Sequence, residues 1–224
     1  MKKGKILIIA AHPDDEILGC GGTISKLKDT NDINVLFMTD GVSARGKNKK
    51  EIIKRKKACI NLFKYLNLPR PIFFNFPDNE MDKISLLKIT KKIEGKIKIY
   101  KPDTIFTHFE NDLNIDHQIT SKAVVTACRP IKNHTVKSII FFEILSSTEW
   151  NISIKNKSFK PNYFVDISKS IKFKLKALKH YKKEMRKWPH PRSIEGVKLL
   201  SKTRGSTVGL QNAEAFILGR HIDK

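Results

Sequence analysis

The chain has 224 residues, and 40% of them are hydrophobic, which is enough for one substantial core and excludes a disordered protein. No apolar run approaches the roughly 20 residues that a membrane-spanning helix needs, and the first apolar run is too short for a signal peptide. Lysine and arginine total 44 against 22 aspartates and glutamates, a net charge of +22 that attracts anionic partners. We therefore expect a single-domain cytoplasmic protein without a membrane span.

The basic residues are mostly lysines spread over predicted helices, without the interleaved aromatic residues typical of proteins that bind single-stranded nucleic acid. We interpret them as solvated helix faces, so a nucleic-acid partner is not expected. The three cysteines, Cys20, Cys59 and Cys128, are widely spaced and lie in apolar surroundings. This pattern is typical of reduced core residues and not of a disulfide framework or a cysteine-rich zinc site.

Short apolar runs alternate with helical spacings along the first two thirds of the chain. Strands are predicted at residues 6–10, 34–39, 72–76, 104–108 and 138–144, and helices at residues 17–28, 49–66, 84–97 and 119–128. A polar loop, residues 109–116, precedes the last of these helices. Such alternation predicts an α/β fold, a Rossmann-like and mostly parallel sheet with helices on both faces.

The last third lacks this alternation. It reads as a short strand at residues 163–166, a long lysine-rich helix from residue 168 to about 187, and a second helix from Ser193 through residue 202. We interpret residues 146–224, approximately, as a C-terminal α-rich extension packed on a core of about residues 1–145. Together they form one predicted domain, residues 1–224.

Polar residues that could bind a metal follow two of the predicted strands. His12 and Asp15 come just after the first strand, and His117 comes in the connection after the fourth. Each part alone is also typical of a capped helix start, because Asp is a favoured cap. Both parts, however, fall where a doubly wound sheet gathers its ligands, and two histidines with one carboxylate form a catalytic zinc set with an open position for water.

Asp14 is a second carboxylate beside Asp15, and two adjacent acids need different roles. With Asp15 on a metal, Asp14 is within reach of the water and can act as a general base. The alternative is a solvated carboxylate at a helix start, where the helix dipole favours it.

These residues belong to a set of motifs that spans nearly the whole chain. The motifs are Ala11-His12-Pro13-Asp14-Asp15-Glu16, Gly19-Cys20-Gly21-Gly22-Thr23, Thr39-Asp40-Gly41, Asp116-His117, His190-Pro191-Arg192-Ser193, Arg204-Gly205-Ser206 and Ala213-Glu214-Ala215-Phe216. In this order they resemble the LmbE-like (PIG-L) deacetylases.

The resemblance implies a zinc-dependent hydrolase that removes the N-acetyl group from an amino sugar, usually N-acetylglucosamine on a lipid, a thiol precursor or a nucleotide. By position it implies that His12, Asp15 and His117 are the metal ligands, that Asp14 is the general base acting on a zinc-bound water, and that Asp116 orients His117. Fe²⁺ suits the same ligand set. The resemblance also suggests a homo-oligomer.

Asn114 departs from the family pattern, since many members have a histidine there that helps to stabilise the oxyanion. An asparagine amide can donate a hydrogen bond but cannot carry a positive charge. His108 and His190 are alternative donors. His108 lies at the end of the fourth strand, where it is equally well explained as a polar edge residue.

Other candidates for substrate contacts lie near the same sheet edge. Arg45 and Arg55 could bind phosphate or sugar hydroxyls, although solvated helix residues are the simpler interpretation. Asp78 follows the third strand, where turn formation explains it equally well. His190 and Arg192 lie in a proline-rich segment that is rigid enough to present side chains to a site.

The hypothesis that follows is a deacetylase of an N-acetylglucosamine-type sugar, with a nucleotide-linked substrate from surface-glycan biosynthesis as its most specific form. One alternative is a metal-dependent deformylase or other amide hydrolase acting on a different small molecule. Another is a nucleic-acid- or anion-binding protein with a vestigial site, which the complete set of His12, Asp14, Asp15 and His117 argues against.

Overall fold

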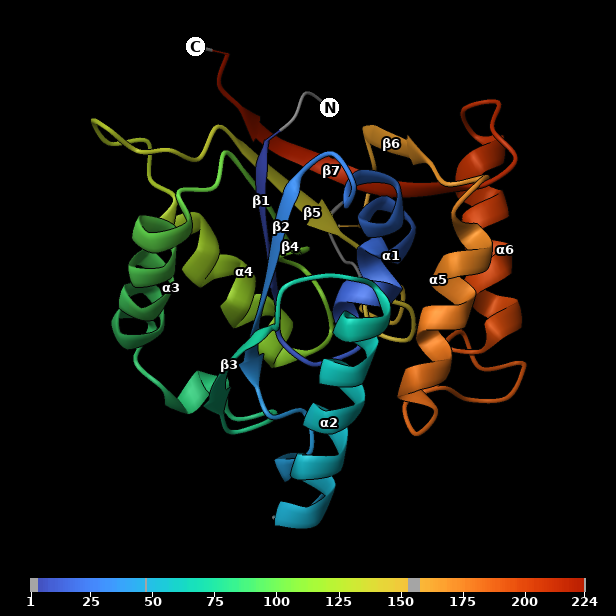
Figure 1. Cartoon of the computed structure of the whole chain (residues 1–224), viewed down its shortest axis with the longest axis horizontal. Helices are drawn as coiled ribbons and strands as arrows, with labels where there is room; N and C mark the ends of the chain where they lie inside the picture. The colour runs from blue at the N-terminus through green and yellow to red at the C-terminus, as the bar shows by residue number, and fades with distance from the viewer. Residues whose placement is uncertain (1–3, 47, 153–157, 224) are drawn as a thin grey trace.

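The fold is a sheet covered by helices on both faces, in a computed structural model that describes residues 4–46, 48–152 and 158–223 (Figure 1). Within these residues seven strands form one sheet in the order β3-β2-β1-β4-β5-β7-β6. The strands are β1 (Lys5–Ala10), β2 (Asp32–Thr39), β3 (Ile72–Phe76), β4 (Thr104–His108), β5 (Ser138–Phe142), β6 (Tyr163–Asp166) and β7 (Ala213–His221). The pairs among β1 to β5 are parallel, whereas β7 is antiparallel to both β5 and β6. The α/β fold is therefore confirmed.

The helices divide between the two faces of the sheet. Their bounds are α1 (Asp15–Leu27), α2 (Lys49–Tyr65), α3 (Leu86–Tyr100), α4 (Ile115–Ala127), α5 (Ile171–Leu178) and α6 (Ile194–Ser206), with short 3₁₀ turns η1 (Ser43–Arg45), η2 (Met81–Lys83) and η3 (Lys179–Tyr181). Figure 1 shows α3 and α4 on one face and α1, α2, α5 and α6 on the other. Successive residues of β1 alternate between the two resulting cores: Ile8 packs under α1 and α2, and Leu7 and Ile9 pack under α3 and α4.

The strand order reverses at β1, which pairs with β2 on one side and with β4 on the other. Ile9 of β1 lies opposite Thr107 of β4, so both strands end at the same level. The segments that follow β1 and β4 are therefore neighbours at the carboxyl edge of the sheet, where open α/β sheets bind ligands.

Helix α1 is kinked at Cys20, whose φ and ψ of −141° and 24° are not helical. Past the kink, the backbone N–H groups of Gly22 and Thr23 donate to the buried Glu214 carboxylate of β7 at 2.8 and 2.7 Å. A Cβ at Gly22 would lie 2.7 Å from the side chain of Ile167, which leaves room only for glycine. The glycine-rich motif and the Glu214 motif, far apart in sequence, thus form a single contact.

Two features of the C-terminal third differ from the sequence-based expectation. Strand β7 was not predicted, yet it lies between β5 and β6 and extends the sheet. The long helix predicted to reach residue 187 was wrong, because α5 ends at Leu178 and a 3₁₀ turn follows. The chain turns there because Tyr181 and Glu184 are buried against Glu16 and Arg55 of the first half. The division of the chain into core and extension stays a prediction.

Two further expectations concern the whole chain. All three cysteines are buried free thiols, as predicted. In the described part of the chain, no helix is long and apolar enough to cross a membrane.

Candidate metal and catalytic site

The three predicted metal ligands meet at the carboxyl ends of β1 and β4. His12 Nδ1 lies 3.1 Å from Asp15 Oδ2 and 3.2 Å from His117 Nε2, and His117 Nε2 lies 3.3 Å from Asp15 Oδ2. The backbone N–H of His12 also donates a hydrogen bond to Asp15 Oδ2 at 2.8 Å, which fixes the turn between β1 and α1. All three side chains are buried, so their donor atoms face one another and not bulk water.

The chemistry of this donor set fits a zinc-type ion. One atom from each of His12, Asp15 and His117 lies within 4.8 Å of the others, giving two imidazole nitrogens and one carboxylate oxygen. The second nitrogen of each histidine faces a carboxylate as well: His12 Nε2 lies 3.2 Å from Asp116 Oδ2, and His117 Nδ1 lies 3.0 Å from Asp112 Oδ1. Metal-binding histidines are commonly oriented by such carboxylates.

A second group, His12, Asp78 and Asp116, shares the same histidine through its other nitrogen. His12 Nε2 lies 3.0 Å from Asp78 Oδ1. The two oxygens of Asp116, however, already accept hydrogen bonds from the N–H groups of Asn79 at 2.7 Å and Met81 at 3.1 Å. The donor set with two nitrogens therefore suits the ion better, and Asp78 and Asp116 support His12.

The expectation that Asp116 orients His117 was wrong. Asp116 contacts His12, and the carboxylate that faces His117 is Asp112, which the sequence analysis did not single out. The hydroxyls of Ser147 and Thr148 donate to Asp112 from the segment after β5. Burial alone would raise the pKa of Asp112, but His117 and these hydroxyls lower it to about 2. Asp112 therefore stays ionised behind His117.

Asp14 lies directly between the three predicted metal ligands and two arginines. Its Oδ1 accepts a hydrogen bond from Arg55 at 2.7 Å, and its Oδ2 lies 3.4 Å from Nη1 of Arg192. The side chain is only 1% exposed. Burial raises the pKa of Asp14, and Arg55 acts in the opposite direction. A buried carboxylate with a raised pKa beside a metal set has the properties of a general base.

Arg55 is a buried support of Asp14 and not the solvated helix residue considered above. Its guanidinium donates to the carbonyl oxygens of Pro13 and Gly41 and forms an ion pair with Glu184 at 3.0 Å. Gly41 has a φ of 69°, and a Cβ there would lie 2.9 Å from the Arg55 guanidinium carbon, so the Asp40-Gly41 turn closes over this arginine. The side chain of Arg45 lies outside the described part of the chain.

Arg192 and His190 approach the site from the loop before α6. Arg192 Nη2 lies 3.4 Å from the carbonyl oxygen of Leu145, and its Nε is buried with no hydrogen-bond partner among the described residues. His190 accepts a hydrogen bond from the N–H of Arg192 at 3.0 Å and packs edge-on against Trp150. Arg192 thus faces Asp14, and its Nε–H group is available to donate a further hydrogen bond.

Asn114 and His108, two of the candidate oxyanion donors, form hydrogen bonds within the protein. The Asn114 side-chain oxygen caps α4 by accepting from the N–H groups of Asp116 and His117 at 2.8 and 3.4 Å, and its amide donates to Asn79. His108 is fully buried behind His117 with its ring stacked at 3.9 Å, and its Nε2 accepts from the N–H of Ala11 at 2.8 Å. His108 therefore packs beneath His117, with its ring buried away from solvent.

Comparison with known proteins identifies the family of the chain. The PIG-L family, described as GlcNAc-PI de-N-acetylase, matches residues 7–128, which include all the residues of the proposed metal set. The chain belongs to the PIG-L family. Members of this family are metal-dependent N-deacetylases, and this chain is an enzyme of that class.

Individual relatives cover most of the chain. The uncharacterized deacetylase YaiS of Escherichia coli K12 is 31% identical over 190 residues, which are 81% of this chain and 92% of that protein. A probable N-acetyl-alpha-D-glucosaminyl L-malate deacetylase 2 of Bacillus cereus is 27% identical over 132 residues, 54% of this chain and 60% of that protein. The structure of N,N'-diacetylchitobiose deacetylase from Pyrococcus horikoshii has the same fold, with a TM-score of 0.78, 21% identity, and coverage of 97% of this chain and 84% of that one.

Proposed function

We propose that this PIG-L family protein is a zinc-dependent deacetylase of an N-acetylglucosamine-type amino sugar. The observation that carries the proposal is the buried cluster of His12, Asp15 and His117, with the Asp14 carboxylate beside it. The names of the family and of the relatives, which act on GlcNAc-PI, a glucosaminyl malate and diacetylchitobiose, support the same substrate class. A nucleotide-linked sugar, a role in surface-glycan biosynthesis and a cytoplasmic location remain our more specific predictions.

His12, Asp15 and His117 would hold the zinc ion in this proposal. When bound, the ion would polarise the acetamide carbonyl and lower the pKa of a water molecule. Asp14 would accept a proton from the attacking water and deliver it to the sugar nitrogen as the C–N bond breaks, so that acetate and a free amine leave. Arg55 would hold the Asp14 carboxylate in place throughout, through its 2.7 Å hydrogen bond.

Arg192 would supply the positive charge that Asn114 does not. Its guanidinium faces Asp14, and the buried Nε has no partner among the described residues. A charged donor aimed at the carbonyl oxygen stabilises the negative charge that develops there during attack. We therefore assign Arg192 to the substrate and leave Asn114 as the cap of α4.

The proposal is tested by measuring acetate release after removal and restoration of the metal. The purified protein is stripped with a chelator and reloaded with Zn²⁺ or Fe²⁺, and each form is assayed on free, phosphorylated and nucleotide-linked N-acetylglucosamine. We expect that the stripped protein is inactive and that Zn²⁺ restores acetate release. A reloaded protein that holds one equivalent of metal and releases acetate from no N-acetylated sugar would contradict the proposed substrate class.

A further inference from the structure

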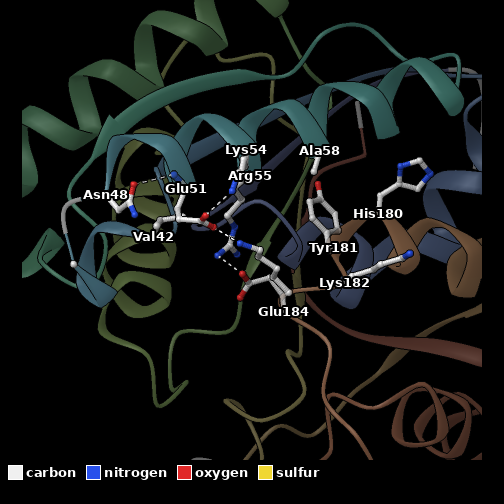
Figure 2. A pocket seen from close by; sticks show the side chains of 12 residues that line it. Val42, Asn48, Glu51, Lys54, Arg55, Ala58, His180, Tyr181, Lys182 and Glu184 are labelled. Carbon is white, nitrogen blue, oxygen red and sulfur yellow. Dashed lines mark hydrogen bonds and ion pairs between the residues drawn. The ribbon is translucent and has the colours of Figure 1, made fainter.

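A pocket of about 580 Å³ lies beside the site, on the other side of Arg55 from Asp14. One wall is the first half of α2, and the other is the segment His180 to Glu184 that follows α5. Figure 2 shows Arg55 and Glu184 facing each other near the middle of the pocket, with Val42 and Asn48 towards one end and His180 and Lys182 towards the other. Its volume falls in the range of about 300–1,000 Å³ that is typical of small-molecule sites.

The pocket and the catalytic site share Arg55. This side chain binds Asp14 at 2.7 Å and forms an ion pair with Glu184, a lining residue, at 3.0 Å. Val42, which lines the pocket, directly follows Gly41, whose carbonyl oxygen also accepts from Arg55. The Arg55–Glu184 ion pair thus separates Asp14 from the pocket, and the Asp40-Gly41 turn, which leads from one to the other, is the route that a substrate held at Asp14 would follow into it.

The charged side chains of the pocket carry an excess of positive charge. Four basic residues, Lys54, Arg55, Lys182 and Lys183, face two acidic ones, Glu51 and Glu184. Lys54 and Lys183 share the single carboxylate of Glu51. Lys182 is exposed and forms no ion pair with the described residues. The pocket thus offers a cation that an anion can engage without breaking an existing pair.

Apolar surface lies beside these cations. Ala58 and Val42 are both partly exposed in the pocket, and the buried ring of Tyr181 closes its floor while its hydroxyl is directed to Glu16. A ligand that suits this pocket combines a negative charge with a compact, partly apolar body. Such a group is larger than the acetamide that the catalytic site acts on.

We propose that this pocket binds the anionic carrier of the amino sugar, a phosphate-bearing group joined to a compact body such as a nucleoside. This inference rests on the proposed function, because it places the sugar at Asp14 and its carrier beyond Arg55. Lys182, at the end of the pocket away from Arg55, would attract the anionic carrier through its charge, and the surface of Ala58, one helical turn from Arg55, would contact the apolar part of the carrier. The catalytic residues would then act on the N-acetyl group of any amino sugar that reaches them, and the pocket would determine which carrier the enzyme accepts.

The test compares KM values for substrates that share the sugar and differ in the carrier. Uridine diphosphate N-acetylglucosamine, N-acetylglucosamine 1-phosphate and free N-acetylglucosamine are assayed with Lys182→Glu and Ala58→Phe. We expect Lys182→Glu to raise the KM of both phosphate-bearing sugars relative to the free sugar by about fivefold, the effect of roughly 1 kcal/mol. Ala58→Phe places a ring in the pocket, and it should raise the KM for the nucleotide-linked sugar, relative to the KM for free N-acetylglucosamine, without raising that for N-acetylglucosamine 1-phosphate. Lys198→Glu, an equal charge change on α6 outside the pocket, is the matched control.

A binding measurement separates the pocket from the chemistry. Uridine diphosphate alone is titrated calorimetrically into the metal-loaded wild type and the same variants, with pyrophosphate as a probe of phosphate recognition without the nucleoside. We expect uridine diphosphate to bind the wild type and to bind both pocket variants more weakly. If acetate is released but neither the KM ratios nor this binding respond to the pocket variants, the pocket proposal is overturned and the proposed function stands. If no sugar releases acetate while uridine diphosphate binds in the expected order, the proposed function fails and the anion site stands.

Discussion

The hydroxyl group of Tyr181 donates a hydrogen bond to Oε1 of Glu16 at 2.7 Å. The other oxygen of Glu16 accepts a hydrogen bond from the N–H of Asp14 at 2.9 Å, and both Glu16 and Tyr181 are buried. Asp14 has a φ of 141°, a conformation that costs a non-glycine residue of the order of 1–3 kcal/mol. The C-terminal third of the chain therefore holds the backbone of the proposed base in its unusual conformation.

Removing this hydroxyl should slow the reaction more than it weakens binding. Tyr181→Phe leaves Oε1 of Glu16 without its donor, and we expect kcat to fall about fivefold, equivalent to roughly 1 kcal/mol for one hydrogen bond, at unchanged KM and metal content. Steady-state kinetics and metal analysis measure this. Tyr163→Phe, on the edge strand β6, is the matched control. Equal kcat values for the two variants would refute a positioning role for Tyr181.

Asp112 should control how tightly the metal is held. In Asp112→Asn the shape remains, but the negative charge that faces His117 Nδ1 at 3.0 Å is lost. We expect the affinity for Zn²⁺ to fall about 10- to 100-fold, measured by competition with a chromogenic chelator. Asp29→Asn, which changes an exposed carboxylate paired with Lys28, should behave as wild type. Retention of wild-type affinity in Asp112→Asn would show that this carboxylate does not tune the metal site.

Arg192 should affect the chemical step through its charge. Arg192→Met removes the charged donor that we assign to the substrate carbonyl, and we expect kcat to fall about 10²- to 10³-fold, with partial recovery in Arg192→Lys. Arg129→Met, which removes an exposed arginine paired with Glu94, controls for the loss of charge. Thermal unfolding of each variant checks that the fold is intact. A folded Arg192→Met protein with wild-type kcat would exclude Arg192 as the oxyanion donor.

The buried pair of Lys174 and Glu214 should matter for stability. Lys174 Nζ donates to Glu214 Oε1 and to the carbonyl oxygen of Leu18, both at 2.7 Å. In Lys174→Met, Glu214 loses its only salt-bridge partner among the described residues, and we expect the free energy of unfolding to fall by about 3–5 kcal/mol in urea titrations. Lys26→Met, which loses one exposed hydrogen bond to Asp166, should cost less than about 1 kcal/mol. If Lys174→Met and Lys26→Met lowered the free energy of unfolding by similar amounts, the buried pair would not have this stabilising role.

Much of the site was predictable because its residues come directly after strands. The apolar run before His12 identifies a buried strand, and strand 104–108 brings His117 to the same sheet edge. Asp112 was not predictable, because its role depends on which nitrogen of His117 faces His12 and Asp15, and that is fixed only by the folded loop. Arg55 was likewise not predictable as a buried residue, because it lies in a lysine-rich helix and its sequence neighbours indicate a solvated side chain. Only the folded structure shows that the Asp40-Gly41 turn covers it.

The C-terminal third was less predictable because long-range contacts decide its structure. The lysine-rich run after Ser168 has good helix formers and contains no glycine or proline before Pro189, so its local pattern favours a longer helix. Burial of Tyr181 and Glu184 against the first half ends that helix early. Strand β7 was missed because it contains Glu214 and Gly219, two residue types that are uncommon in strands. The buried Glu214 carboxylate is tolerated there because the backbone N–H groups of the kinked α1 donate hydrogen bonds to it, a contact that the local sequence does not reveal.

The central claim is that Asp14 is the base of a metal-dependent deacetylation, and acetate release by Asp14→Asn tests it most directly. The variant and the wild type are loaded with one equivalent of Zn²⁺ and assayed on the same N-acetylated sugar. Because the amide cannot accept the proton, we predict that kcat falls by about 10²- to 10⁴-fold while the metal content is unchanged. An Asp14→Asn protein that holds the same metal and releases acetate at the wild-type rate would contradict the claim.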